Sequence, residues 1–197
     1  MTSIIYNKTF DEPEIDKREI LRYAGVRGEA ELVEALLDDC IRESSGRLSY
    51  RVCYREIDLN STLPAFLRSD SYTLKKNLRG CDGVILFAAT VGIEMDRLIN
   101  KYGKLSPARS VMLDALGSER IEALCDTFED AIRMEYAELG IGVRTRFSPG
   151  YGDFGLSAQS EIFELLLPEK KIGLTLNKSM LMSPTKSVTA LMGISHI

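Results

Sequence analysis

The sequence predicts an α+β domain with a mainly antiparallel sheet and helices to one side. Predicted helices occur in runs between strands that are not neighbours in the chain, without the steady strand–helix alternation that builds a parallel sheet. Residues 84–89 form the most continuously apolar run, which is typical of a central strand buried on both faces. No stretch resembles a linker, so we expect one domain over residues 1–197.

The first fifth of the chain predicts an edge strand and two helices. Residues 4–10 have the pattern of a short edge strand. A helix is expected over residues 16–24, with Asp16 as its N-cap. A longer helix follows over residues 29–45, where apolar side chains recur on one face.

A strand is expected over residues 50–59, but its apolar residues change parity along the way. Tyr50, Val52 and Tyr54 would share one face, whereas Ile57 and Leu59 fall on the other. Because a bulge adds one residue to a strand, we expect a bulge near residues 55 and 56 that restores a common face.

The rest of the chain predicts helices followed by a C-terminal pair of strands. A helical stretch over residues 64–79 is expected to break at 69–71. Residues 106–139 predict the longest helix, opened by Ser106 and Pro107 and kinked at Gly117. A further helix is expected over 157–167, capped by Ser157, and strands are expected over 172–176 and 185–194.

Charge and hydropathy argue against nucleic-acid and membrane partners. The net charge is -4, with both signs mixed along the chain and no basic stripe for phosphates. No apolar run approaches the roughly 18 residues of a membrane span, and the first residues do not resemble a secretion signal. We therefore expect a cytoplasmic protein.

The cysteines and the single histidine give no catalytic or metal site. Cys40, Cys53, Cys81 and Cys125 are far apart, without a Cys-x-x-Cys pair, and are expected to be buried free thiols. His196 is the only histidine, so its number excludes histidine clusters for metals and Ser-His-Asp triads.

Residues 142–157 are the most informative segment, because a β-prone arm runs there into a glycine-rich loop. Arg146 offers a planar, permanently charged guanidinium suited to a carboxylate. Residues 149–152, Pro-Gly-Tyr-Gly, predict a tight bend that holds an aromatic ring. This pairing suits a small zwitterion with a flat ring, although a type II turn beside a solvated arginine fits the same residues.

Residues 146–151 resemble the S-adenosylmethionine-binding motif, Arg-x-x-x-Gly-Tyr, of the activation domain of cobalamin-dependent methionine synthase. Residues 172–184, Ser187 and Val188 are similar to the C-terminal segment of that family, and residues 19–25 are similar to its start. The resemblance implies a single C-shaped α+β domain around a twisted antiparallel sheet that is flanked by helices.

The resemblance also implies roles for particular residues. Arg146 would pair with the carboxylate of S-adenosylmethionine, and Tyr151 would lie against the ligand. The backbone near Ser148 and Gly150 would bond the adenine edge, where glycine allows a close approach. No catalytic or metal-binding residue is implied, because the cofactors carry the chemistry.

In the family an acidic residue near the start of the domain holds the ligand amine, and here Asp11 or Asp16 could serve. The sequence departs from the family pattern at residues 152–155, which replace prolines and a cysteine, and at Leu191 and Met192, which replace aromatic residues. Weaker stacking on the adenine is therefore expected.

By resemblance, the leading hypothesis is a free-standing reactivation subunit of a split methionine synthase, which belongs to a methyltransferase system. It would support the reductive methylation of cob(II)alamin to methylcobalamin, with cobalamin carried by a partner subunit and an electron from flavodoxin or another reductase. Two alternatives stay open: an activator of another corrinoid methyltransferase, and a non-catalytic docking scaffold for a cobalamin-binding protein.

Overall fold

The computed structural model describes residues 4–27 and 31–196, and it confirms the α+β class. One antiparallel sheet has the strand order β1-β2-β3-β7-β4. Its strands are β1 (Tyr6–Phe10), β2 (Tyr50–Asp58), β3 (Gly83–Thr90), β4 (Ile141–Val143) and β7 (Ser187–His196). A separate hairpin pairs β5 (Thr175–Leu176) with β6 (Met182–Ser183).

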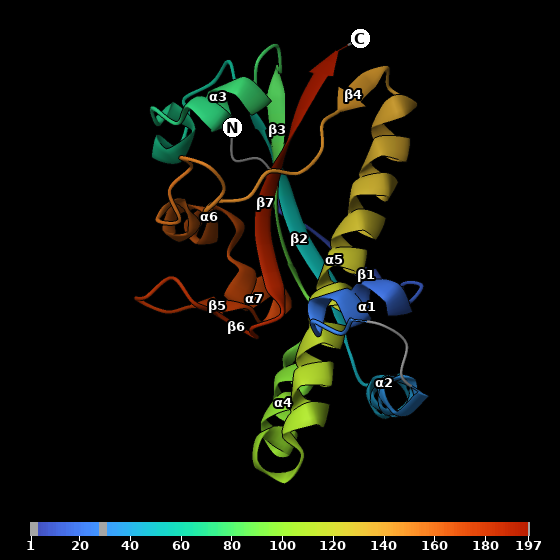
Figure 1. Cartoon of the computed structure of the whole chain (residues 1–197). Coiled ribbons are helices and arrows are strands. Elements are labelled where there is room, and N and C mark those ends of the chain that lie inside the picture. The colour runs from blue at the N-terminus through green and yellow to red at the C-terminus, as the bar shows by residue number, and fades with distance from the viewer. Residues whose placement is uncertain (1–3, 28–30, 197) are drawn as a thin grey trace.

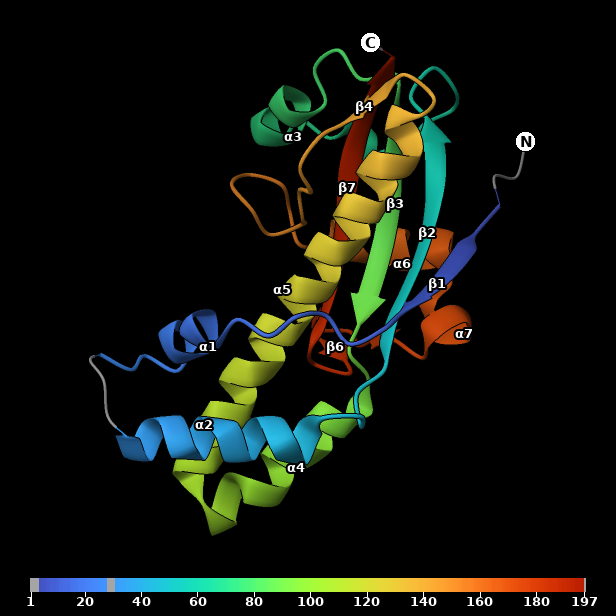
Figure 2. The ribbon, with the colours of Figure 1, turned by 90° about the vertical axis from the view of Figure 1, so that its right-hand side faces the viewer.

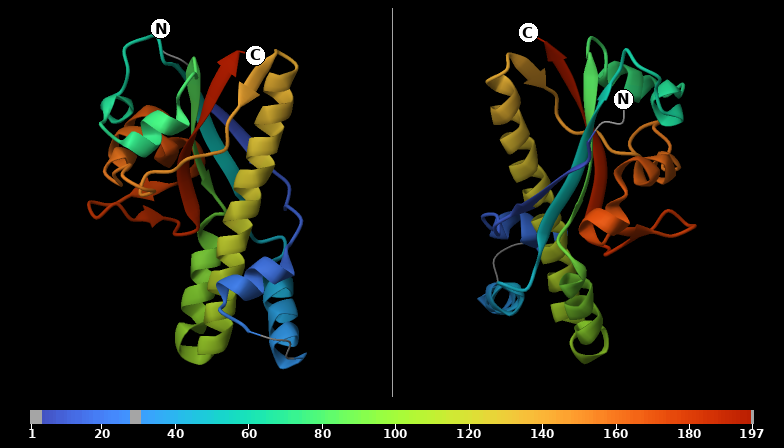
Figure 3. Two further views of the ribbon diagram at one scale, coloured as in Figure 1. Left: turned by 45° about the horizontal axis from the view of Figure 1, so that its top comes forward. Right: turned by 180° about the vertical axis from the view of Figure 1, so that it is seen from behind.

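Helices cover both faces of this sheet instead of one (Figure 1). The α-helices are α1 (Lys17–Tyr23), α2 (Glu31–Ser44), α3 (Tyr72–Asn77), α4 (Ile93–Leu105), α5 (Pro107–Ala137), α6 (Ala158–Leu166) and α7 (Pro168–Ile172), and a 3-10 helix, η1, spans Ala65–Arg68. The long α5 runs along one face, and α4 lies against its first half in a hairpin that extends beyond the sheet (Figure 3). Helices α6 and α7 lie on the opposite face.

The central strands are buried from both sides, which explains why the bulge predicted in β2 is absent. All eight residues of β3 are buried, as expected for residues 84–89. Strand β2 pairs with β3 in an unbroken register from Arg51 to Asp58, so the expected bulge is absent. Its change of parity has another cause, because Val52 packs on the α5 side while Cys53 and Ile57 pack on the α6 side.

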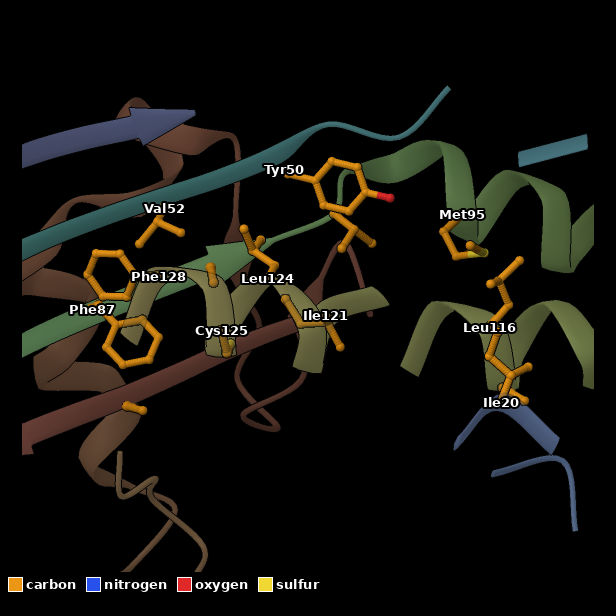
Figure 4. Close-up of a cluster of buried hydrophobic side chains, with 14 of the residues drawn as sticks. Ile20, Tyr50, Val52, Phe87, Met95, Leu116, Ile121, Leu124, Cys125 and Phe128 are labelled. Carbon is orange, nitrogen blue, oxygen red and sulfur yellow. The ribbon is translucent and has the colours of Figure 1, made fainter. Parts of the chain in front are cut away.

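In the core on the α5 side, Phe128 lies with other aromatic residues at one end of the cluster (Figure 4). The centroid of its ring lies 4.9 Å from that of Phe87 and 5.2 Å from that of Tyr54. Strand β7 presents its even-numbered residues to this core, as the sequence predicted: Val188, Ala190, Met192 and Ile194.

Helix α5 continues without interruption across Gly117, where a kink was expected. A Cβ atom at this position would lie 2.7 Å from Cγ of Met95 and 2.9 Å from Cγ of Lys186. The glycine therefore serves close packing between α5, α4 and the segment before β7.

Other local expectations were confirmed in part. Asp16 caps α1 by accepting hydrogen bonds from the N–H groups of Arg18 and Glu19. Neither Ser106 nor Ser157 makes a side-chain cap bond. The break expected at 69–71 separates η1 from α3, whereas most of the strand expected over 172–176 is replaced by the end of α7 and a turn. The first two residues of the helix expected over 29–45 lie outside the described part of the chain.

Strand β1 forms one edge of the sheet, as expected (Figure 2). The other edge is formed by residues 141–147, called the β4 arm, which comprise β4 and the extended chain after it. Across residues 4–27 and 31–196, every helix is too short or too polar to cross a lipid bilayer.

Candidate ligand-binding site

The second half of β7 is covered by the β4 arm, but its first half is open. Arg144 donates its N–H to the carbonyl of Gly193, and Phe147 exchanges two backbone hydrogen bonds with Leu191. Beyond Phe147 the chain turns away into the glycine-rich loop. Within the described residues, no strand pairs with residues 187–190 on this side of β7.

A hollow of about 660 Å³ lies at this open edge. Its volume is in the range of small-molecule sites. The residues that line it come from α5, the β4 arm and its loop, α6, β6 and β7: Glu122, Asp126, Glu129, Arg133, Thr145, Arg146, Phe147, Ser148, Pro149, Tyr151, Gln159, Met182, Ser187, Val188 and Thr189. Three of the predicted site residues, Arg146, Ser148 and Tyr151, are therefore brought together.

The guanidinium of Arg146 forms ion pairs with three carboxylates of α5. Its nitrogen atoms lie 2.8 Å from Glu122, 2.5 Å from Asp126 and 2.8 Å from Glu129. Burial opposes its charge, but the hydrogen bonds that it donates to Asp126 and Glu122 outweigh this effect and raise the pKa of Arg146 above its ordinary value. Three of its five N–H donors thus have carboxylate partners, and a ligand carboxylate can pair with the remaining donors or displace one of the acids.

The three carboxylates differ in how readily they can be displaced. The side chains of Glu122 and Asp126 are 45% and 65% exposed, whereas that of Glu129 is 3% exposed. An exposed ion pair contributes only about 0–1 kcal/mol. Glu129 therefore holds the guanidinium of Arg146 in place, and Asp126 or Glu122 can turn away from it at little cost.

The electrostatic character of this end of the hollow is acidic. Glu122, Asp126 and Glu129 face two guanidinium groups, those of Arg133 and Arg146. The remaining negative charge favours a ligand that carries positive charge, because partly buried charges are screened less than exposed ones.

The aromatic part of the hollow is built by the loop. Tyr151 is 67% exposed. Its ring centroid lies 6.4 Å from that of Phe147, which stacks on Phe154 at 5.8 Å. Gly150 does not line the hollow, and its N–H donates to the carbonyl of Phe154. It has a φ of +95°, so it forms the bend that holds Tyr151.

Asp153 is a residue that the sequence analysis missed. Its carboxylate accepts hydrogen bonds from the hydroxyl of Ser71 and from the N–H groups of Tyr72 and Thr73, at 2.6 to 3.0 Å, and from the Thr73 hydroxyl. The bonds from Thr73, Ser71 and Tyr72 lower the pKa of Asp153. These contacts fix the loop to the start of α3, about 80 residues away in sequence, and no local pattern reports them.

The two predicted acids near the N-terminus are placed differently. Asp16 lines a second hollow, of about 460 Å³, and this hollow shares Glu122 and Asp126 with the first. Asp11 is exposed and lines neither hollow. Of the two, Asp16 is the better placed to approach a ligand bound beside Arg146.

Two further polar residues of the hollow gave no signal in the sequence. Gln159 on α6 and Thr189 on β7 are 5% and 2% exposed. The Oε1 atom of Gln159 and the Oγ1 atom of Thr189 have no hydrogen-bond partner. Buried polar atoms are almost always paired, so both atoms require an explanation.

Comparisons with known proteins identify a family and a shared fold. The family described as vitamin B12 dependent methionine synthase, activation domain, matches residues 67–196, which include the whole glycine-rich loop. A solved structure of the MetH reactivation domain bound to AdoHcy is similar with a TM-score of 0.64 and 17% sequence identity. The likeness covers 96% of this chain and 78% of that one, and at this identity it shows a shared fold. No curated protein matches.

Proposed function

The chain belongs to the activation-domain family of vitamin B12-dependent methionine synthase, and we propose that it binds S-adenosylmethionine to reactivate such an enzyme. The observation that carries this proposal is the position of the loop. Arg146, Ser148 and Tyr151 line one hollow of suitable size at the open edge of β7. AdoHcy, bound by the similar reactivation domain, is the demethylated form of this ligand.

The residues of the hollow fit the groups of S-adenosylmethionine. The acidic end suits its ammonium and sulfonium charges. Its carboxylate would take the place of Asp126 or Glu122 on Arg146, and the displaced acid, or Asp16 beside it, would then accept the ammonium. Tyr151 offers an exposed ring for the adenine, and the backbone at Ser148 lies beside it.

The chain's part in the reaction is to bind and orient, which explains why no acid or base is needed. When bound, S-adenosylmethionine would supply a methyl group; together with one electron from a reductase this would convert cob(II)alamin to methylcobalamin and leave S-adenosylhomocysteine. The cobalamin would be carried by a partner subunit of a split methionine synthase. Flavodoxin or another reductase would supply the electron.

Isothermal titration with S-adenosylmethionine tests the proposal. The Arg146→Ala variant should lose roughly 1.5 to 3 kcal/mol of binding free energy, because a charge-assisted hydrogen bond is removed. Arg144→Ala is the matched control. Arg144 lies two residues earlier in the same arm, donates to the carbonyls of Asn77 and Arg79, and does not line the hollow.

The control variant should bind like the wild-type protein. If the wild-type protein binds no S-adenosylmethionine, either alone or with the cobalamin-binding partner, the proposal is wrong. A non-catalytic docking scaffold is the second candidate, and the three ion pairs that already occupy Arg146 favour it. Capture of the cobalamin-binding subunit by a chain that binds no S-adenosylmethionine would support the scaffold.

A further inference from the structure

The hollow contains two buried oxygen atoms without partners, Oε1 of Gln159 and Oγ1 of Thr189. A third buried polar residue of the same hollow, Ser187, is different. Its hydroxyl is bonded to the Thr90 hydroxyl at 2.9 Å and to the Pro184 carbonyl at 2.8 Å. The interior of the protein therefore provides partners for Ser187 and provides none for the two oxygen atoms.

The two side chains lie beside the open edge of β7. In an antiparallel strand the backbone N–H and C=O groups of successive residues point alternately to the two neighbouring strands. Those of Thr189 therefore point to the same side as those of Leu191. On this side Leu191 exchanges two backbone bonds with Phe147, whereas no described strand pairs with Thr189 there; β3 pairs with Thr189 on the opposite side. The N–H and carbonyl of Thr189 thus point to the side where the hollow lies.

This set of groups matches the edge of a heteroaromatic ring. The amide of Gln159 can accept and donate, and so can the hydroxyl of Thr189. Tyr151 contributes an aromatic face to the same hollow, while the charged groups around Arg146 lie on the α5 side. One end of the hollow therefore suits a flat base and the other a charged tail.

We propose that Gln159 and Thr189 recognise the amino-substituted edge of the adenine ring and select adenine nucleosides. In this arrangement Oε1 of Gln159 accepts a hydrogen bond from the 6-amino group, and Thr189 bonds a ring nitrogen. The inference rests on the proposed function, because it assigns the base-binding part of the same site.

A pair of ligands and a pair of variants test this assignment by titration. The ligands are S-adenosylhomocysteine and its analogue without the 6-amino group. Wild-type protein should bind the analogue about tenfold more weakly, since a buried acceptor stays unpaired. Gln159→Leu should bind S-adenosylhomocysteine about tenfold more weakly and should no longer distinguish the two ligands. Thr189→Val should bind both S-adenosylhomocysteine and the analogue more weakly than the wild-type protein does.

Thermal unfolding of the ligand-free proteins provides a second readout. Replacing an unpaired buried polar group by an apolar one of similar shape is neutral or stabilising, so Gln159→Leu and Thr189→Val should keep or raise the Tm. Ser187→Ala is the matched control, and it should lower the Tm because its hydroxyl has partners. A purely structural role for Gln159 or Thr189 predicts the opposite result.

The outcomes separate this inference from the function on which it rests. If wild-type protein binds S-adenosylhomocysteine but the Gln159 and Thr189 variants bind it equally well, the base assignment is wrong and the proposed function stands. A loss of Tm like that of Ser187→Ala would also overturn the assignment. If wild-type protein binds neither S-adenosylmethionine nor S-adenosylhomocysteine, both proposals fail.

Discussion

Replacing Glu129 by glutamine tests the claim that this residue, more than its two neighbours, holds Arg146 in place. Its side chain is 3% exposed, and its two oxygen atoms bond Arg146, at 2.8 Å, and Arg133. Both partners are donors, whereas a glutamine amide has one oxygen and one NH₂ group. The change therefore removes one charge-assisted bond and leaves the other with a charged donor but a neutral acceptor, which weakens it.

The expected loss follows from these bonds. A hydrogen bond to a charged group contributes about 1.5–3 kcal/mol and a neutral one about 0.5–1.5 kcal/mol. Because Arg133 is partly exposed, we expect the Glu129→Gln variant to lose about 2–3 kcal/mol of unfolding free energy. Urea denaturation at pH 7 should show a midpoint about 1 M lower, at a slope of about 2–3 kcal/mol per M.

Asp126→Asn is the matched control, because it removes a carboxylate from the same guanidinium. The side chain of Asp126 is 65% exposed, so the loss should stay below about 1 kcal/mol. Equal losses in the two variants would refute the argument that burial separates the fixed acid from the displaceable one.

Three other expectations concern the helix packing, the loop and the thiols. In Gly117→Ala the gain of about 1 kcal/mol in helix propensity should be outweighed by the contact with Met95 at 2.7 Å, so thermal unfolding should show a lower Tm. Hydrogen bonds lower the pKa of Asp153, so its contribution is present above its unfolded pKa of about 3.9 and is lost as the pH falls through the lower folded value. Asp153→Asn should therefore be less stable than wild-type protein in urea at pH 7, and the difference should shrink below about pH 4. Among the four free cysteines only Cys81 is not fully buried, so mass spectrometry after brief thiol labelling of the folded protein should find the label on Cys81; equal labelling of the others would contradict the observed burial.

The sequence predicted those parts of the fold that depend on neighbouring residues. The apolar run of β3 and the alternating apolar residues of β7 indicate directly which side chains are buried. The cap at Asp16 was predictable because its partners lie only two and three residues later. The bulge in β2 was predicted wrongly because the argument assumed one buried face. The second face of β2 is buried by helices that lie much later in the sequence. Both the odd and the even residues of β2 can therefore be apolar without a bulge.

The structure groups three of the predicted site residues, and their binding role stays a prediction. The motif brought Arg146, Ser148 and Tyr151 to one hollow, as expected from their nearness in sequence. The acids that pair with Arg146 lie on a helix 17 to 24 residues earlier, so the motif alone could not predict them. Gln159 and Thr189 were missed for a related reason, since an unpaired atom is visible only when all possible partners are placed.

The spacing of the Arg-x-x-x-Gly-Tyr motif has a physical basis in how the arm crosses the sheet. Successive residues of an extended chain point to opposite faces, so Arg146 reaches α5 while Phe147 packs beside Phe154. Pro149 has no N–H with which to continue the pairing, and Gly150 turns the chain away with a φ of +95°. An extra residue after Arg146 would direct the guanidinium toward the aromatic face and away from Glu129. The motif therefore fixes three things together: the face that receives the charge, the point at which the edge of β7 opens, and the ring that stands beside that opening.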